Sequence, residues 1–209
     1  NRTFSGLKKA VLRLKSALPT AFERIKWFNL GGGFFFDKIL RTEPFKEAVR
    51  LLREHQDIEV VIEPGTSLVQ NAAYLVTTVV DLYPSDGLMI AVLDTTMGHM
   101  PEVYTYGFSP PVMGASPVPS DSTDNLDHTY LLAGASCLAG DVFGTYAFDK
   151  PIEIGSQIVI EKMGAYTHSQ WHWYNGINLP TIYTNSAETG LQMAESFSFP
   201  DFAHHCAMS

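Results

Sequence analysis

The feature of this sequence that most limits its possible folds is a change in hydrophobic periodicity near residue 74. Before that point, apolar residues at three- and four-residue steps predict an amphipathic helix over residues 6–18. A second helix is predicted to begin at Thr42 as N-cap, with Pro44 in its first turn. Short apolar runs at residues 25–30 and 58–62 predict a buried strand after each helix. The order helix, strand, helix, strand is typical of parallel α/β architecture.

The remainder of the chain is predicted to be mainly β. Strand-like runs occur at residues 74–82, 88–93, 157–163 and 190–197. The segment 109–127 is rich in proline and serine, so we expect a surface loop or a disordered excursion there. We therefore expect two domains, residues 1–73 and residues 74–209.

Composition and charge exclude several classes of protein. With 45% hydrophobic and 17% charged residues, the chain is expected to be globular rather than disordered. A formal net charge of -8 argues against nucleic-acid and anionic-membrane partners. No apolar run approaches the roughly 20 residues that a membrane helix needs. The two cysteines, Cys137 and Cys206, are too few for a disulfide framework and favour a reducing, cytoplasmic setting.

Two candidate sites lie at the ends of the first two predicted strands. Gly31, Gly32 and Gly33 follow the first strand, and their backbone N–H groups can converge on a phosphate because no Cβ blocks the approach. The same glycines can equally form a tight turn that needs positive φ. Glu63 follows the second strand, at the functional edge of a parallel sheet. Its carboxylate can pair with a cationic ring nitrogen or cap the helix that follows, and the residues alone leave both open.

The third candidate is Cys137, in a loop of small residues at 133–141. A thiol with a reference pKa of ~8.5 can donate a proton near neutral pH, although a small buried hydrophobe is the alternative. We expect no metal site, because no paired-cysteine or carboxylate spacing frames His168 and His172, or His204 and His205.

Taken in order, five stretches of the chain resemble the fold-type III pyridoxal-phosphate decarboxylases, the family of diaminopimelate and ornithine decarboxylase. Within that family they are most similar to the carboxynorspermidine (carboxyspermidine) decarboxylases. The stretches are WFNLGGG from Trp27, IEPG from Ile62, LDTT from Leu93 with HMPEV from His99, CLAGDV from Cys137, and YNGINLP from Tyr174. The resemblance implies an α/β part, the C-terminal part of an alanine-racemase-like TIM barrel, followed by an all-β barrel or sandwich domain.

The resemblance also implies how pyridoxal 5'-phosphate is held. The family's glycine turn, here Gly31, Gly32 and Gly33, binds the cofactor phosphate. A tyrosine after the last long strand, here Tyr166, contacts the same phosphate. The family's EPG glutamate, here Glu63, keeps the pyridine nitrogen protonated, so that the ring accepts electrons when carbon dioxide leaves.

The substrate side of the site follows from the same resemblance. Cys137 corresponds to the cysteine that protonates the substrate α-carbon and reaches the active site from the partner subunit. Asp141 is expected to face the distal amine of a polyamine. Thr66 stands where the carboxynorspermidine enzymes carry a second acidic residue, and Glu102 stands where they carry an aspartate. These two departures are expected to alter the substrate pocket.

The family's Schiff-base lysine has no counterpart here. Lys8, Lys9, Lys15 and Lys26 precede the glycine turn, but they lie on a predicted helix or just before a strand. We therefore expect the Schiff-base lysine to lie outside this segment. We also expect the chain to be the C-terminal half of a longer homodimeric enzyme, whose active site is shared across the interface.

The resemblance predicts an enzyme of polyamine biosynthesis. Its reaction would be the decarboxylation of carboxynorspermidine or carboxyspermidine to norspermidine or spermidine. A decarboxylase of a basic amino acid, such as diaminopimelate, ornithine, lysine or arginine, is the alternative within the family. A catalytically inactive relative that binds a partner or a polyamine is the alternative outside enzymes.

Overall fold

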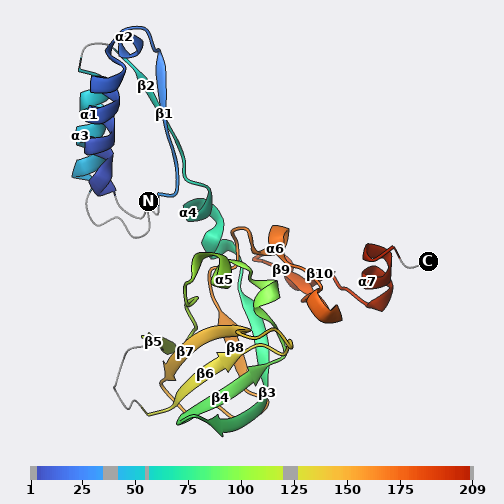
Figure 1. The fold of residues 1–209 in the computed structure, drawn as a ribbon. Coiled ribbons are helices and arrows are strands. Elements are labelled where there is room, and N and C mark those ends of the chain that lie inside the picture. The colour runs from blue at the N-terminus through green and yellow to red at the C-terminus, as the bar shows by residue number, and fades with distance from the viewer. Residues whose placement is uncertain (1–3, 35–41, 55–56, 120–126, 208–209) are drawn as a thin grey trace. The chain divides into compact units, whose positions relative to one another are not determined.

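The computed structural model describes residues 4–34, 42–54, 57–119 and 127–207. The chain divides into two compact units, Asn1–Gln70 and Asn71–Ser209. Figure 1 shows the elements of both, and each unit is described by itself. The division falls after Gln70, whereas the sequence analysis places the domain boundary after residue 73.

The first unit is a parallel α/β arrangement. Strands β1 and β2 pair in parallel, and helices α1 and α3 lie side by side along the two strands (Figure 1). The elements are η1 (Phe4–Gly6), α1 (Leu7–Ala17), α2 (Pro19–Phe22), β1 (Trp27–Gly32), α3 (Glu43–Leu52), β2 (Glu59–Glu63), α4 (Gly65–Val69) and η3 (Gln70–Ala72), the last of which extends past the division. The predicted order helix, strand, helix, strand is confirmed. Thr42 is the N-cap of α3 as predicted, although its side chain makes no capping hydrogen bond.

The core of the first unit lies on one face of the two strands. Their apolar side chains alternate along the chain, and those on one face pack with the buried residues of α1 and α3, as the 2-residue period of a strand requires. The members of this core are Phe4, Leu7, Val11, Phe34, Ala48 and Leu52, with Phe28, Leu30, Val60 and Ile62 packed against them. The other face is open, and Trp27 there is 62% exposed. The prediction of two buried strands was wrong in this respect, because helices cover one face only in the described part of this unit.

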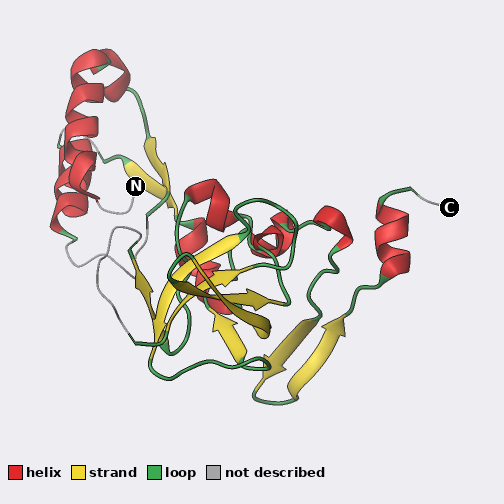
Figure 2. Ribbon diagram, turned by 60° about the horizontal axis from the view of Figure 1, so that its bottom comes forward, coloured by secondary structure: helices red, strands yellow, loops and turns green. Residues whose placement is uncertain are grey.

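The second unit is built on a six-stranded sheet. The strands are β3 (Leu75–Ser85), β4 (Leu88–Leu93), β5 (Ala115–Val118), β6 (Thr129–Ala133), β7 (Val142–Phe148) and β8 (Gln157–Ile160), in the order β5-β7-β6-β4-β3-β8. All neighbours are antiparallel except β4 and β6, which run parallel. The sheet is strongly curled (Figure 2). Its concave side encloses a core that includes Val79, Leu93, Leu132, Phe143 and Tyr146.

One segment joins both edges of this sheet. Residues of β5 pair with β7 at one edge. Just before them, the backbone N–H of Met113 donates to the carbonyl of Val159 (3.0 Å), and the carbonyl of Pro111 accepts from the N–H of Glu161 (2.9 Å), at the β8 edge. The predicted loop at 109–127 was therefore wrong for residues 115–118. β5 is an edge strand and pairs with β7 on one side only, so the N–H that Pro117 lacks is not required by a second neighbouring strand. Residues 120–126 of that prediction lie outside the described residues.

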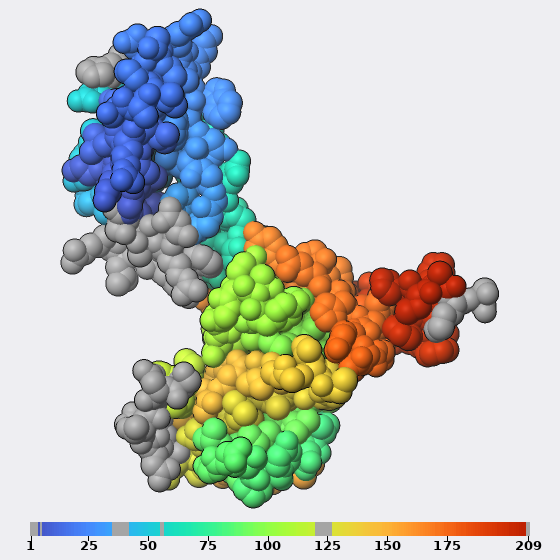
Figure 3. All heavy atoms as spheres, in the orientation of Figure 1, coloured from blue at the N-terminus to red at the C-terminus, as the bar shows by residue number. Residues whose placement is uncertain are grey.

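The rest of the second unit surrounds the sheet with short elements. They are η4 (Met97–His99), α5 (Glu102–Tyr106), α6 (Thr167–Gln170), η5 (Tyr174–Gly176), the antiparallel hairpin β9 (Ile182–Ser186) and β10 (Gly190–Glu195), and α7 (Phe199–His205). The hairpin does not join the six-stranded sheet, and the hairpin and α7 form the orange-to-red outlying part of Figure 3. Phe197 ties this part back, because its ring contacts the rings of Trp171 and Trp173 at 5.7 and 6.0 Å. None of the helices in the described residues is long and apolar enough to span a bilayer.

Candidate active site

The glycine turn lies at the carboxyl end of β1. Gly31 and Gly33 have φ values of 74° and 80°, a region that disfavours side chains. At Gly32, a Cβ would lie 2.5 Å from the carbonyl oxygen of Glu63 on the neighbouring strand. The glycines are therefore required by the turn itself. The backbone N–H of Gly31 donates to Asn29 Oδ1 (2.8 Å), so this N–H is already engaged. Phosphate binding by the turn stays a prediction.

Glu63 lies beside the glycine turn on the open face of the strand pair. Glu63 is the register partner of Gly32 across β1 and β2. Its Oε1 accepts a hydrogen bond of 2.6 Å from Asn29 Nδ2. The donor to the carboxylate therefore lies on the neighbouring strand, and the N-cap of α4, Pro64, supplies no side-chain cap. Glu63 remains exposed, with Oε2 available to a second donor.

Asn29 is a site residue that the sequence analysis missed. Its amide donates to the carboxylate of Glu63 and its carbonyl accepts from the turn, so one side chain connects both predicted cofactor contacts. Its position inside the stretch WFNLGGG could have indicated a role in the site. The carboxylate that it contacts lies 34 residues away, however, and no local pattern predicts that contact.

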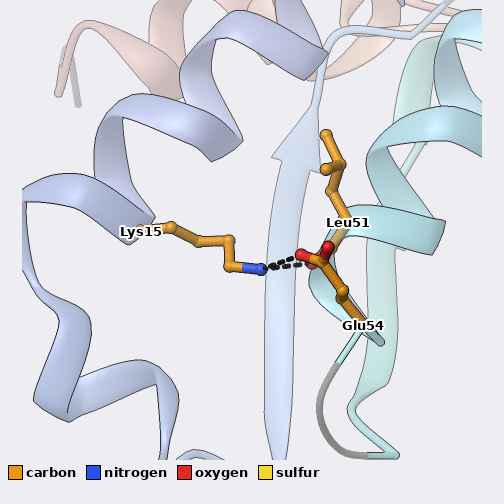
Figure 4. Close-up of polar contacts among 3 residues, drawn as sticks. All are labelled: Lys15, Leu51 and Glu54. Atoms are coloured by element: carbon orange, nitrogen blue, oxygen red, sulfur yellow. Dashed lines mark hydrogen bonds and ion pairs between the residues drawn. The ribbon is translucent and has the colours of Figure 1, made fainter.

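Two lysines of α1, Lys8 and Lys15, contact residues of α3 or the residue that follows it closely. Lys15 Nζ donates to the carbonyl of Leu51 (2.8 Å) and to Glu54 Oε2 (2.9 Å), as Figure 4 shows. Lys8 Nζ pairs with Glu47 Oε2 at 3.1 Å. Both amines therefore connect α1 to α3, which agrees with the expectation that neither is the Schiff-base lysine. Thr66 lies half-buried in α4, directly after the EPG stretch.

The second unit holds the other candidates around one buried turn. Residues 95–103, which follow β4 and include the HMPEV stretch, are all buried. Within the turn, Thr95 Oγ1 and His99 Nδ1 are hydrogen-bonded at 2.9 Å, and His99 Nε2 has no hydrogen-bond partner among the described residues. Burial is the main cause that lowers the pKa of His99 to about 4; His172 adds to this and Asp141 opposes it. His99 is therefore neutral at physiological pH.

Asp141 fastens the Cys137 loop to this turn. It is 4% exposed, and its Oδ1 accepts from the backbone N–H of Met97 (2.7 Å). Its Oδ2 accepts from the N–H of Ser136 (3.0 Å) and from the Ser136 hydroxyl. A Cβ at position 134 would collide with the carboxylate, which explains Gly134. The observed role of Asp141 is thus to fix the loop, and a contact with the substrate amine stays a prediction.

Cys137 is exposed near the tip of that loop. The alternative of a small buried hydrophobe is therefore wrong. Its Sγ accepts a hydrogen bond of 2.7 Å from Asn175 Nδ2. Asn175 belongs to the YNGINLP stretch, and it is the second site residue that the sequence analysis missed.

The same buried turn holds the segment that contains Tyr166. Glu102 is 5% exposed, and its Oε1 accepts from Thr167 Oγ1 (2.7 Å). Its Oε2 is buried without a hydrogen-bond partner in the described part of the chain. Tyr166 precedes Thr167, has a left-handed φ of 63° and is 48% exposed. Such a conformation is uncommon for a bulky side chain and concentrates at functional sites. The substrate role of Glu102 and the phosphate role of Tyr166 stay predictions.

The predicted residues thus fall into two groups. One group, in the first unit, consists of Gly31, Gly32, Gly33, Glu63 and Thr66. The other, in the second unit, consists of Glu102 in the buried turn and of Cys137, Asp141 and Tyr166 in the segments packed around it. Among the described residues, no group of three or more His, Cys, Asp or Glu side chains is arranged to hold a metal ion.

Comparison with known proteins identifies the family. Residues 25–164 match the family model described as pyridoxal-dependent decarboxylase, C-terminal sheet domain. The chain belongs to this family of pyridoxal-dependent decarboxylases. The predicted fold, a parallel α/β part followed by the sheet domain of fold-type III pyridoxal-phosphate decarboxylases, is confirmed.

Three members of the family show the degree of likeness. Carboxynorspermidine/carboxyspermidine decarboxylase of Herminiimonas arsenicoxydans is 31% identical over 97% of this chain and 53% of its own length. Carboxyaminopropylagmatine decarboxylase of a Synechocystis strain is 30% identical over 94% of this chain and 50% of its own. The crystal structure of carboxynorspermidine decarboxylase from Campylobacter jejuni, complexed with norspermidine, superimposes with a TM-score of 0.81 at 29% identity, over 98% of this chain and 57% of that one. The chain spans about half the length of these relatives.

Proposed function

We propose that this chain contributes to a pyridoxal-phosphate-dependent decarboxylase that acts on a carboxylated polyamine, with carboxynorspermidine or carboxyspermidine as substrate. The observation that carries the proposal is the likeness, over nearly the whole chain, to relatives named for these substrates. The contact between Cys137 and Asn175 supports it, because it joins the two stretches, CLAGDV and YNGINLP, that distinguish this branch.

The residues at the strand ends suit the cofactor. A glycine turn with two left-handed residues offers close backbone approach to a phosphate. Glu63, beside the turn and still exposed, offers a carboxylate to a protonated ring nitrogen. Tyr166 offers an exposed phenol as a further phosphate donor. When bound, the cofactor would supply the electron sink for the electron pair left by departing carbon dioxide.

Cys137 is proposed to finish the reaction. Its S–H bond breaks as the proton moves to the substrate α-carbon, a new C–H bond forms, and the sulfur keeps the negative charge until water returns a proton. Exposure near a loop tip lets the thiol reach a substrate, and the clamp through Asp141 fixes the loop that carries it.

The distal part of the substrate is proposed to meet acidic groups. A polyamine chain is cationic, which the net charge of -8 favours. Glu102 Oε2 is a buried oxygen without a partner in the described residues, so it would gain from an ammonium donor. Thr66 in place of an acidic residue would leave one contact fewer near the EPG stretch.

We also infer a homodimer in the cytoplasm, with Cys137 supplied to the partner's site. Exposed apolar side chains support a second copy as the partner, among them Leu191 and Met193 of β10 and Phe199 of α7. A two-stranded hairpin is marginal without a surface to cover it. The two free cysteines, Cys137 and Cys206, are both exposed, which suits a reducing compartment.

A substrate panel tests the proposed function. The protein expressed from its complete gene is incubated with pyridoxal phosphate and carboxynorspermidine, carboxyspermidine, carboxyaminopropylagmatine, diaminopimelate, ornithine, lysine or arginine, and each amine product is quantified. We expect the highest kcat/KM with carboxynorspermidine or carboxyspermidine. Preference for a simple amino acid would overturn the substrate, and no activity together with no covalent cofactor adduct after borohydride reduction would favour the inactive relative.

A mixing experiment tests the shared site. Glu63→Gln and Cys137→Ala variants are each expected to have low activity. If Cys137 serves the partner, each mixed dimer has one intact site, so an equal mixture after subunit exchange should regain about one quarter of the wild-type activity. If both residues serve the same subunit's site, the mixture gains nothing.

A further inference from the structure

We propose that Asn175 is a positioning residue for Cys137: its side-chain amide holds the thiol sulfur and stabilises the negative charge that remains after the thiol has given up its proton. This inference rests on the proposed function of Cys137 as proton donor.

The geometry of the contact carries the inference. Asn175 Nδ2 lies 2.7 Å from Cys137 Sγ, and the two residues are 38 positions apart. The interaction therefore joins two separate segments at an exposed position, where water could otherwise satisfy both groups. Both cysteines are exposed, and among the described residues Cys137 is the one whose sulfur accepts from a side-chain amide.

Both sides of the contact are built on anchored backbone. On the cysteine side, Asp141 accepts hydrogen bonds from Ser136 and Met97, and the N–H of Ala135 donates to the carbonyl of Thr95 (2.8 Å). The thiol therefore sits one residue from a clamped position.

The asparagine side is anchored at several points along its own segment. The N–H of His172 donates to the carbonyl of Gly98 (3.2 Å), and Asn178 Nδ2 donates to the carbonyl of Phe197 (2.7 Å). The ring of Trp173 contacts that of Phe197. Asn175 lies between these anchors with a φ of 56°, a left-handed conformation that asparagine tolerates better than most residues.

The chemistry of the contact suits a proton donor. An amide N–H interacts more strongly with a thiolate than with a neutral thiol, because a charged acceptor strengthens the hydrogen bond. When the proton leaves Cys137 for the substrate carbon, the S–H bond breaks and the electron pair stays on sulfur, so the amide stabilises the product of the step. The same bond orients the sulfur before the step.

The test compares variants that keep the left-handed backbone. Asn175→Asp replaces the donor by a carboxylate of the same shape, and Asn175→Gly removes the side chain; both residues tolerate positive φ. Asn185→Ala is the control, since Asn185 is an exposed asparagine of β9 that takes no part in anchoring the Asn175 segment.

The first readout is chemical and needs no turnover. The protein expressed from its complete gene is alkylated with iodoacetamide at pH 7.5, and the rates at Cys137 and Cys206 are measured by peptide mass, with Cys206 as reference within the same molecule. The thiolate is the reacting form, so we expect the Cys137/Cys206 rate ratio to fall about tenfold in Asn175→Asp, because the donor becomes a like charge, and less in Asn175→Gly. The ratio should stay within about twofold of wild type in Asn185→Ala. An unchanged ratio in both Asn175 variants would overturn the inference.

The second readout separates this inference from the proposed function. With the preferred substrate, Asn175→Asp should lower kcat about tenfold with little change in KM, since the amide acts on the proton-transfer step and not on binding. A wild type that decarboxylates while both Asn175 variants keep its kcat would overturn the positioning role alone. A wild type without activity on any substrate of the panel would overturn the proposed function, and with it the catalytic meaning of the contact, whatever the alkylation ratio.

Discussion

The two units hold their functional groups in different ways. In the first unit, Glu63 is exposed on the open face of a strand pair and accepts a hydrogen bond from the side-chain amide of Asn29. In the second, Asp141 is 4% exposed and accepts three hydrogen bonds from two residues. The second unit therefore fixes its site through a buried polar network, whereas the first relies on glycine backbone geometry and a single amide. Burial makes a satisfied network rigid, and it makes the loss of one member costly.

The largest effect is expected at Asp141. Asp141→Ala would leave the N–H groups of Met97 and Ser136 without their acceptor, so we expect a loss of about 4 kcal/mol in the free energy of unfolding of the second unit. Urea denaturation followed by Trp171 and Trp173 fluorescence, in a Trp27→Phe background, measures this. The exposed Asp149 is the matched control, and Asp149→Ala should change the free energy by less than about 0.5 kcal/mol. A loss at Asp141 as small as that of the control would remove the contrast between the two units.

His99 gives the next effect, and it depends on pH. Its folded-state pKa of about 4 lies below the ordinary value of 6.5, because the buried ring resists protonation. The unfolded chain then binds the proton more readily, so stability is full above pH 6.5 and is lost as pH falls toward 4, by roughly 3 kcal/mol.

The measurement is the difference in unfolding free energy between wild type and a His99→Gln variant at pH 7, 6, 5 and 4. We expect the variant to lack this part of the pH dependence. His204, which is exposed, supplies the control, and His204→Gln should keep the wild-type slope. Parallel curves for wild type and His99→Gln would contradict the burial of a neutral histidine in the turn.

Neighbouring glycines in the first unit give a sharper comparison. Gly32→Ala would place a Cβ 2.5 Å from the carbonyl oxygen of Glu63 and force β1 and β2 apart, at a cost of about 3 kcal/mol. Gly31→Ala meets open space and incurs only left-handed strain, about 1 kcal/mol. Thermal unfolding of both variants, followed by Trp27 fluorescence, should show the larger shift for Gly32→Ala. Equal shifts would show that the turn is not limited by contact between the strands.

Of two expected losses of activity in the first unit, the smaller is at Asn29. Glu63→Gln should lower kcat about 100-fold by weakening the pairing with the ring nitrogen. Asn29→Ala leaves that carboxylate in place but frees its orientation, so we expect about a tenfold loss in kcat with the fold intact. Glu59→Gln, an exposed carboxylate at the other end of β2, should keep wild-type activity. An Asn29→Ala variant with wild-type kcat would mean that Glu63 needs no support.

Local patterns in the sequence predicted α1, α3, β1 and β2 of the first unit, because amphipathic periodicity there is strong and the partners are close in sequence, but they did not predict the short helices α2 and α4. They missed β6, β7 and β9, which are short and contain few β-branched residues, and β5, where prolines indicated a loop. The stretches that carry the likeness located Glu63, Cys137 and Asp141. They did not indicate Asn29 or Asn175, because each acts on a partner more than 30 residues away and an asparagine in a turn has many ordinary uses.

The segment that joins the two edges of the sheet has a consequence for how the second unit is made. Residues 111–118 bond to β7 on one side and to β8 on the other, and β8 also completes the pairing of β3, more than 70 residues earlier in the chain. A ribosome that releases the chain from its N-terminus therefore delivers β3, β4 and β5 long before the strand that closes them. Until β8 is synthesised, the edges of these strands that pair with it stay unpaired. We therefore expect folding of this unit to be slow and to depend on the emergence of Gln157–Ile160.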